Sequence, residues 1–93
     1  MVIGILTIEL DIPGNNSLKE KRRVIKSLIG RVKSRFNVSI AEVGENDKYR
    51  RAELGMSVVS NEKAHANTML DHVADFIRGD GRVVVVHLEM ELF

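Results

Sequence analysis

Apolar residues alternate with other residues at both ends of this chain. In residues 2–12, one side of an extended backbone is wholly apolar and comprises Val2, Gly4, Leu6, Ile8, Leu10 and Ile12. A period of two predicts a strand with one face in the core. Residues 82–92 alternate in the same way, with a predicted core side of Val84, Val86, Leu88, Met90 and Leu92. The chain is therefore expected to begin and end in strands.

Helical spacing replaces alternation in two segments between these strands. The first helix is predicted over residues 18–36, and its apolar stripe comprises Leu18, Ile25, Leu28, Ile29, Val32 and Phe36. Ser17 and Glu20 form a capping box at its start. The second helix is predicted from Ser60-Asn61 to Arg78, with Gly79 placed for a left-handed C-cap. Its buried side comprises Ala66, Met69, Leu70, Val73 and Ile77.

Two further strands are predicted between the helices. Residues 38–44 and 51–60 form a hairpin, because the segment 45–48 between them is polar and rich in turn residues. The element order is then βαββαβ, and each strand–helix–strand unit requires a right-handed crossover. Two such units joined by a hairpin predict an α+β, ferredoxin-like sandwich with two helices on one face of a four-stranded antiparallel sheet. Residues 1–93 form a single domain of this kind.

The composition narrows the class of protein. Hydrophobic residues make up 44% of the chain and charged residues 29%, a balance typical of globular domains rather than disordered ones. The absence of cysteine excludes disulfides and thiolate chemistry. We expect a cytoplasmic protein, since the N-terminus lacks the basic region of a signal peptide and no apolar stretch is long enough to span a membrane. No cofactor is expected.

The net charge of +1 conceals a strong polarity along the chain. Residues 17–36 hold eight of the fourteen basic residues and one acid, a local charge of +7, while the rest of the chain carries −6. At about 100° per residue, five cations form one stripe on the first helix: Lys19, Arg22, Arg23, Lys26 and Lys33. Neighbouring like charges repel one another. The stripe therefore predicts a polyanionic partner, RNA or a ribosomal particle, bound through its phosphate backbone.

The loop before this helix is a second candidate site for anions. It consists of Gly14, Asn15, Asn16 and Ser17, and its backbone N–H groups adjoin the positive end of the helix dipole. Two other readings of the stripe stay open. Acids such as Asp47 or Glu53 could neutralise it, within the fold or across a dimer, or it could be simply a solvated charged face.

The side of the sheet that the helices leave uncovered is the third candidate site. Its small and aliphatic residues are typical of a homodimer or protein-docking surface. The residues predicted at this interface are Ile3, Ile5, Tyr49, Val59, Val83 and Val85. The two central strands contain no aromatic residue, which excludes the base-stacking mode of RNA-recognition domains of similar topology. A homodimeric protein-interaction module is therefore the alternative to an RNA-associated factor.

The candidates for metal binding and catalysis are few. His65 and His72 lie two helical turns apart, too far to share a metal ion directly, and His87 stands alone on the last strand. Acylphosphatases share this topology, but they need an asparagine on the third strand to activate water. Residues 54–57 offer none. Neither a metal site nor an enzymatic activity is predicted.

Four segments carry a resemblance to a known family. They are Ile12-Pro-Gly, Ser17-Leu-Lys-Glu-Lys-Arg-Arg23, Phe36-Asn-Val-Ser-Ile-Ala-Glu-Val43 and Leu54-Gly-Met-Ser-Val-Val-Ser-Asn61. Together they resemble the bacterial YlxP-like proteins, small domains of unknown function, over nearly the whole chain. The resemblance implies a ferredoxin-like fold. Genes of this family often lie beside genes for translation initiation and ribosome maturation, so it also implies a ribosome-associated or RNA-binding role by association.

Overall fold

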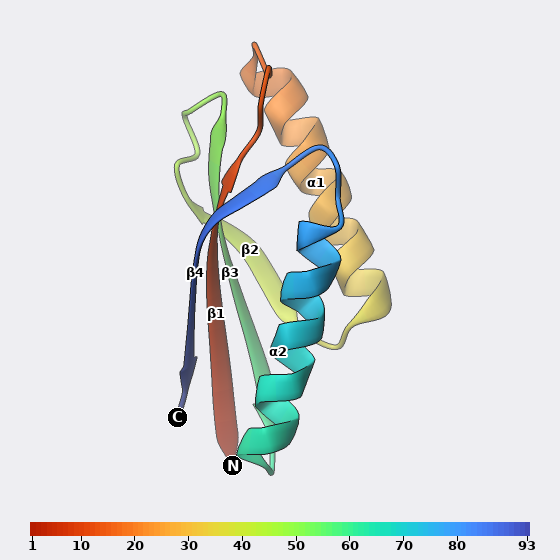
Figure 1. Cartoon of the computed structure of the whole chain (residues 1–93), viewed down its shortest axis with the longest axis vertical. Coiled ribbons are helices and arrows are strands. Elements are labelled where there is room, and N and C mark those ends of the chain that lie inside the picture. The colour runs from red at the N-terminus through yellow and green to blue at the C-terminus, as the bar shows by residue number, and fades with distance from the viewer.

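The computed structural model describes all 93 residues and contains four strands and two helices. In chain order these are β1 (Val2–Asp11), α1 (Leu18–Arg35), β2 (Ser39–Gly44), β3 (Arg51–Ser60), α2 (Lys63–Arg78) and β4 (Val84–Leu92). The sheet order is β2-β3-β1-β4, and every neighbouring pair is antiparallel. Both helices lie on one face of the sheet (Figure 1). The structure is thus the predicted ferredoxin-like sandwich.

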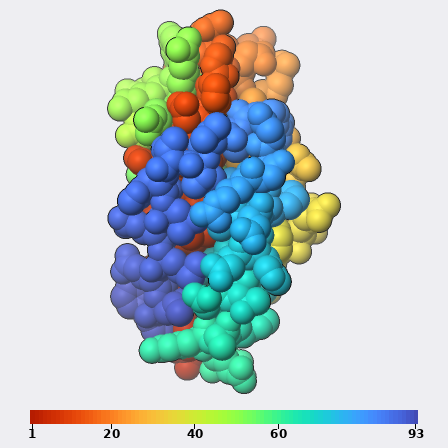
Figure 2. All heavy atoms as spheres, viewed as in Figure 1, coloured from red at the N-terminus to blue at the C-terminus, as the bar shows by residue number.

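The core fills the space between the sheet and the two helices. Leu6, Ile8 and Leu10 of β1 are completely buried, and they pair across the sheet with core residues of β3. The helices contribute the buried residues Ile25, Leu28, Val32, Ala66, Leu70, Val73, Ala74 and Ile77. The atoms of α2 and β4 adjoin along much of the molecule (Figure 2). The period-two and helical patterns therefore predicted most of the core correctly.

The start of α1 follows the predicted cap in part. The Ser17 side chain accepts a hydrogen bond of 3.1 Å from the backbone N–H of Glu20. The Glu20 carboxylate does not complete a capping box, because it lies 3.6 Å from Arg23 instead. The helix ends one residue earlier than predicted, since Phe36 has an extended backbone. The Phe36 ring packs edge to face on Phe76 of α2, with 5.8 Å between ring centres.

Val83 and Val85 do not lie on the uncovered face of the sheet, so their predicted placement is wrong. Val83 is buried in the core, and Val85 pairs with the core residue Leu10 of β1. The cause is a β-bulge at Val86, where the register between β1 and β4 shifts by one residue. One extra residue turns the preceding side chains to the opposite face. Val84 and Val86 are consequently exposed rather than buried.

The turn between α2 and β4 is organised by the buried carboxylate of Asp80. This carboxylate accepts hydrogen bonds from the Arg82 side chain at 2.7 and 3.0 Å and from the Arg82 backbone N–H at 2.9 Å. Arg31 of α1 also donates to it at 3.4 Å. The hydrogen bonds from Arg82 hold the pKa of Asp80 below its usual value. Gly79 is right-handed, with φ −76°, so the predicted left-handed C-cap is wrong.

Asp80→Asn is expected to destabilise the fold at neutral pH by about 1–3 kcal/mol, because the network loses its negative charge and one of its two acceptor oxygens is replaced by an NH2 donor. A carboxyl whose pKa falls on folding stabilises the protein above its ordinary pKa of 3.8, and this contribution is lost as the pH falls through the folded value. The free energies of unfolding of the wild-type protein and of Asp80→Asn, measured with urea, should therefore differ at neutral pH and become similar in acid. The exposed Asp75→Asn is the control, with an expected change of less than about 0.5 kcal/mol. An Asp80→Asn effect independent of pH would contradict this account.

Candidate nucleic-acid interface

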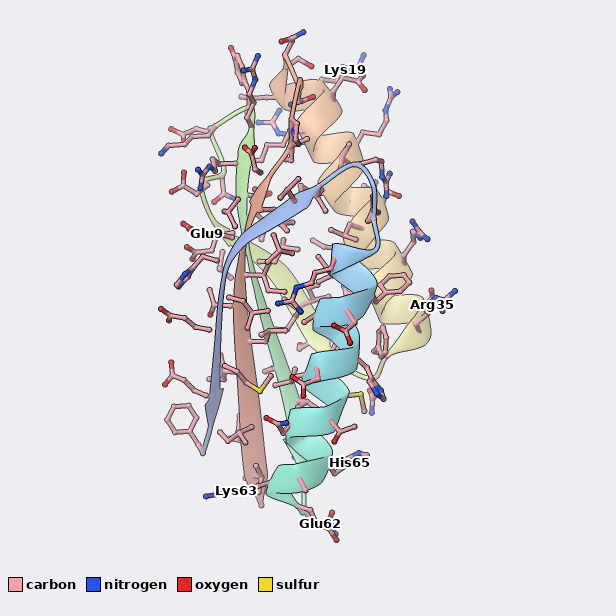
Figure 3. All side chains as sticks on the ribbon, viewed as in Figure 1. Glu9, Lys19, Arg35, Glu62, Lys63 and His65 are labelled. Atoms are coloured by element: carbon pink, nitrogen blue, oxygen red, sulfur yellow. The ribbon has the colours of Figure 1, made fainter.

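The predicted basic stripe lies on the solvent side of α1. All five members are exposed: Lys19, Arg22, Arg23, Lys26 and Lys33. They occupy an arc of about 100° and extend about 21 Å along the helix axis, at 1.5 Å per residue. Figure 3 labels Lys19 near the start of α1 and Arg35 at its end, and the stripe runs between them. Four of the cations lie within about two helical turns and Lys33 lies about two turns further on, all open to a large partner.

Three other cations of α1 lie outside the stripe, and each has a partner inside the fold. Lys21 is buried against the start of the β2–β3 connection. The guanidinium carbons of Arg31 and Arg35 lie 5.4 and 4.9 Å from the centre of the Phe76 ring, which is a cation–π arrangement. Of these three cations only Lys21 is buried, whereas Arg31 and Arg35 are exposed but rest on the Phe76 ring.

The basic stripe forms almost no ion pairs with acidic residues of the same chain. Its only ion pair joins Arg23 to Glu20, on the surface and at 3.6 Å. Glu53 lies on β3 opposite Glu9, and Asp47 lies in the β2–β3 connection, so neither of these acids reaches the stripe. Apart from the Arg23–Glu20 pair, the stripe therefore forms no direct ion pair within the fold. The uncompensated repulsion costs roughly 0.2–0.5 kcal/mol for each neighbouring pair.

Lys21 attaches the first turns of α1 to the end of β2. Its side chain is only 1% exposed, its Nζ lies 3.0 Å from Glu42 Oε2, and it donates a hydrogen bond to the carbonyl of Glu45. Burial of an ammonium group is costly unless partners surround it, and here a carboxylate and a carbonyl do so. Sequence reasoning missed this role. The available signal was the position of Lys21, four residues before Ile25 and on the same helix face.

The loop before α1 is braced against the β2–β3 connection. Asn15 Nδ2 donates to the carbonyl of Tyr49 at 2.6 Å and to the carbonyl of Ser17 at 2.9 Å. Arg50 returns two hydrogen bonds, from Nε to the carbonyl of Asn15 at 2.9 Å and from Nη2 to Asn16 Oδ1 at 3.2 Å. The side chains of two predicted anion-binding residues are therefore already engaged within the protein.

The other two residues of this loop also have structural roles. Gly14 has φ +74°, a left-handed conformation that glycine adopts without strain and that turns the chain into the helix. The hydroxyl of Ser17 caps α1 through Glu20. An anion at this loop would consequently depend on the free backbone N–H groups of the first helical turn rather than on side chains.

The uncovered face of the sheet has an apolar end and an acidic part. At the apolar end, Ile3 pairs with Val59 of β3 and exchanges backbone hydrogen bonds with Phe93, and Val59 and Phe93 are 66% and 62% exposed. Ile5 follows on β1, half-buried and opposite Glu91 of β4. Further acids on this face are Glu9, Glu53 and Glu89. Other exposed hydrophobic residues of the strands are Val43, Val84 and Val86.

Tyr49 lies away from the other predicted interface residues. It precedes β3, whereas Val59 lies near the far end of that strand, about 30 Å away at the rise of an extended chain. With Val83 and Val85 directed into the core, the predicted interface does not form one surface.

His87 on β4 is paired with an acid rather than arranged for metal binding. Its Nε2 lies 2.9 Å from Glu89 Oε1, and this hydrogen bond, with the charges of Glu89 and Glu9, raises the pKa of His87. His65 and His72 are exposed on α2. No group of three or more potential ligands is arranged to hold a metal ion. Neither helix is long and apolar enough to cross a membrane.

Known proteins resemble this chain in sequence and in fold. The family model described as "Protein of unknown function (DUF503)" matches residues 3–90. The uncharacterized protein YlxP of Bacillus subtilis (strain 168) is 40% identical over 76 residues, which cover 82% of this chain and 83% of that protein. The de novo designed protein Foldit4 aligns with 100% of this chain and 97% of its own, with a TM-score of 0.54 and 12% identity, a likeness of fold alone. The resemblance to YlxP-like proteins is confirmed, and the chain belongs to the DUF503 family of proteins of unknown function.

Proposed function

We propose that this protein is a non-enzymatic RNA-binding factor that associates with ribosomal particles through the basic stripe of α1. The observation that carries the proposal is the unpaired state of the stripe: five exposed cations on one helix face share a single surface ion pair. Adjacent like charges destabilise a helix, and a polyanion bound along them relieves this repulsion. RNA is a polyanion of this kind, with a long row of evenly spaced phosphates.

Binding of this kind should depend strongly on salt and weakly on base sequence. Each phosphate neutralised by a cation contributes about −0.7 to the slope of log K against log salt for a single strand. Five contacts give a slope of about −3.5, so affinity should fall on the order of 100-fold when the salt concentration rises fourfold.

The test is co-sedimentation of the purified protein with ribosomal particles at low and at high salt, together with filter binding to ribosomal RNA. We expect association with a ribosomal subunit at low salt and its loss at high salt. The absence of association with particles and with RNA at low salt would overturn the proposal.

The apolar end of the uncovered face favours a second candidate function, a homodimeric interaction module. Ile3, Val59 and Phe93 form a contiguous exposed cluster there, and removing such a cluster from water favours self-association. The measurement is sedimentation velocity of the protein and of Val59→Glu over a range of concentrations. A dimer that Val59→Glu dissociates, and that Val84→Glu at the other end of the sheet leaves intact, would support this function. A monomer at high concentration would exclude it.

A further inference from the structure

We infer that Tyr49 is a stacking platform for an unpaired base of the RNA whose phosphates lie on the stripe of α1. The inference rests on the proposed function and adds a ligand class to it, namely RNA with at least one unpaired nucleotide. It follows from the exposure of the ring, the bracing of its backbone and its position beside the start of α1.

Tyr49 is exposed to solvent in a loop that also carries acidic and basic residues. The residue is 53% exposed, and a shallow depression of about 450 Å³ is lined by Asp47, Lys48, Tyr49, Arg50 and Arg51. The other three aromatic residues are placed elsewhere: Phe36 and Phe76 pack against each other, and Phe93 lies beside Ile3. Tyr49 is thus the one aromatic ring at this end of the molecule. Bases of any sequence can stack on such a ring, because every base has a π-face.

The backbone that carries Tyr49 is held from two sides. On one side, the carbonyl of Tyr49 accepts the hydrogen bond from Asn15. On the other side, Glu45 is fixed in a left-handed conformation with φ +62°, and its carbonyl accepts hydrogen bonds from the Lys21 side chain and the Lys48 backbone N–H. A braced loop loses little conformational freedom when a ligand binds. The entropic cost of ordering the loop therefore offsets less of the stacking energy.

This loop and the Lys19 end of the stripe lie at the same end of the molecule. Asn15 Nδ2 bonds both Tyr49 and Ser17, so a single side chain joins the tyrosine's backbone to the N-cap of α1. Figure 1 shows the β2–β3 connection and the start of α1 together at the top of the view. A strand whose phosphates leave the stripe at Lys19 and pass over the N-terminal end of α1 therefore reaches the loop that carries Tyr49. Bases inside a duplex cannot stack there, because both of their faces are covered by neighbouring pairs, whereas an unpaired base can.

Tyrosine fluorescence gives a direct readout of this contact. The chain contains one tyrosine and no tryptophan, so its intrinsic emission reports on Tyr49 alone. Titration with a single-stranded oligouridylate should quench the emission, whereas a fully paired RNA duplex of similar length should bind with less quenching. Binding is measured separately, by anisotropy of a labelled RNA.

Two substitutions separate stacking from charge. Tyr49→Ala should weaken single-strand binding by about 5- to 150-fold, which is the range for the loss of one base–aromatic stack, and should leave duplex binding unchanged. Tyr49→Phe keeps the ring and should bind both RNAs like the wild type. The side chain is exposed and the brace uses backbone atoms, so both variants should fold.

The outcomes distinguish this inference from the proposed function. Salt-sensitive binding of wild-type protein to the single strand, with no quenching and with equal affinity of Tyr49→Ala, would overturn the inference and leave the proposed function standing. The absence of binding to either RNA at low salt would overturn both. Equal losses for Tyr49→Ala on the single strand and the duplex would also overturn the inference, since a stack on an unpaired base predicts a difference.

Discussion

The double variant Arg22→Glu/Lys26→Glu is expected to bind RNA at least about 30-fold more weakly than the wild-type protein. Both residues lie in the middle of the exposed stripe, and neither has an acidic partner in the fold. A charge pair at contact distance in water is worth about 1 kcal/mol. Loss of two such contacts costs about 2 kcal/mol, or about 30-fold, before the repulsion of the new carboxylates is included. Anisotropy of a labelled RNA at low salt measures the change.

The fold should tolerate this variant. Both side chains are exposed, and the new glutamates replace repulsion by attraction toward Lys19 and Arg23, each three residues away on the same helix. The midpoint of thermal unfolding should therefore be unchanged or slightly raised. A loss of RNA binding can then be assigned to the surface rather than to unfolding.

A matched control distinguishes the stripe from the overall charge of the protein. Lys63→Glu/Arg78→Glu, at the two ends of α2, lowers the net charge by the same four units. RNA affinity should fall much less in this control, and its salt dependence should stay close to that of the wild type. Equal losses of RNA affinity in the two double variants would show that binding depends only on the net charge of the protein. The stripe would then not be the RNA-binding site.

Lys21→Met is expected to destabilise the fold by about 3 kcal/mol or more. The substitution leaves the half-buried carboxylate of Glu42 without its partner and the carbonyl of Glu45 without its donor. Removal of one partner from a buried ion pair typically costs about 3–5 kcal/mol. Because small domains are stable by only about 5–15 kcal/mol, urea unfolding should detect this change easily.

Two further variants identify the cause of this loss. Lys19→Met, an exposed lysine of the same helix, should change stability by less than about 0.5 kcal/mol. Lys21→Met/Glu42→Leu should recover much of the lost stability, because apolar residues can replace a buried ion pair. The orphaned carbonyl of Glu45 should leave a deficit of about 1–3 kcal/mol. If Lys21→Met were as stable as Lys19→Met, the clamp between α1 and β2 would not contribute to folding.

Loss of this clamp should also loosen the loop that carries Tyr49. Lys21 holds the carbonyl of Glu45, four residues before the tyrosine. Amide hydrogen exchange in residues 45–50 should therefore accelerate in Lys21→Met by more than in α2, as expected for local opening. Uniform acceleration across the protein would instead indicate global destabilisation alone.

The amino-acid sequence by itself determined the element order and most of the core. These follow from local periodicity: the alternation of β1 and β3, the helical spacing around Leu28 and Leu70, and the cap at Ser17 depend on neighbours within a few residues. The basic stripe could be predicted for the same reason, since a helix of known phase places its own side chains. What such a stripe binds does not follow from periodicity.

Only the tertiary structure decided which of these residues are free and which are engaged. The bulge at Val86 depends on pairing with β1, more than seventy residues earlier in the chain. It turns the side chains of Val83 and Val85 to the core side of the sheet. Similarly, Lys21 is a structural cation because β2 supplies Glu42, and Tyr49 adjoins the start of α1 because Asn15 reaches it across 34 residues. Local patterns fix the direction of a side chain relative to its own element, whereas its burial and partners depend on where distant elements meet.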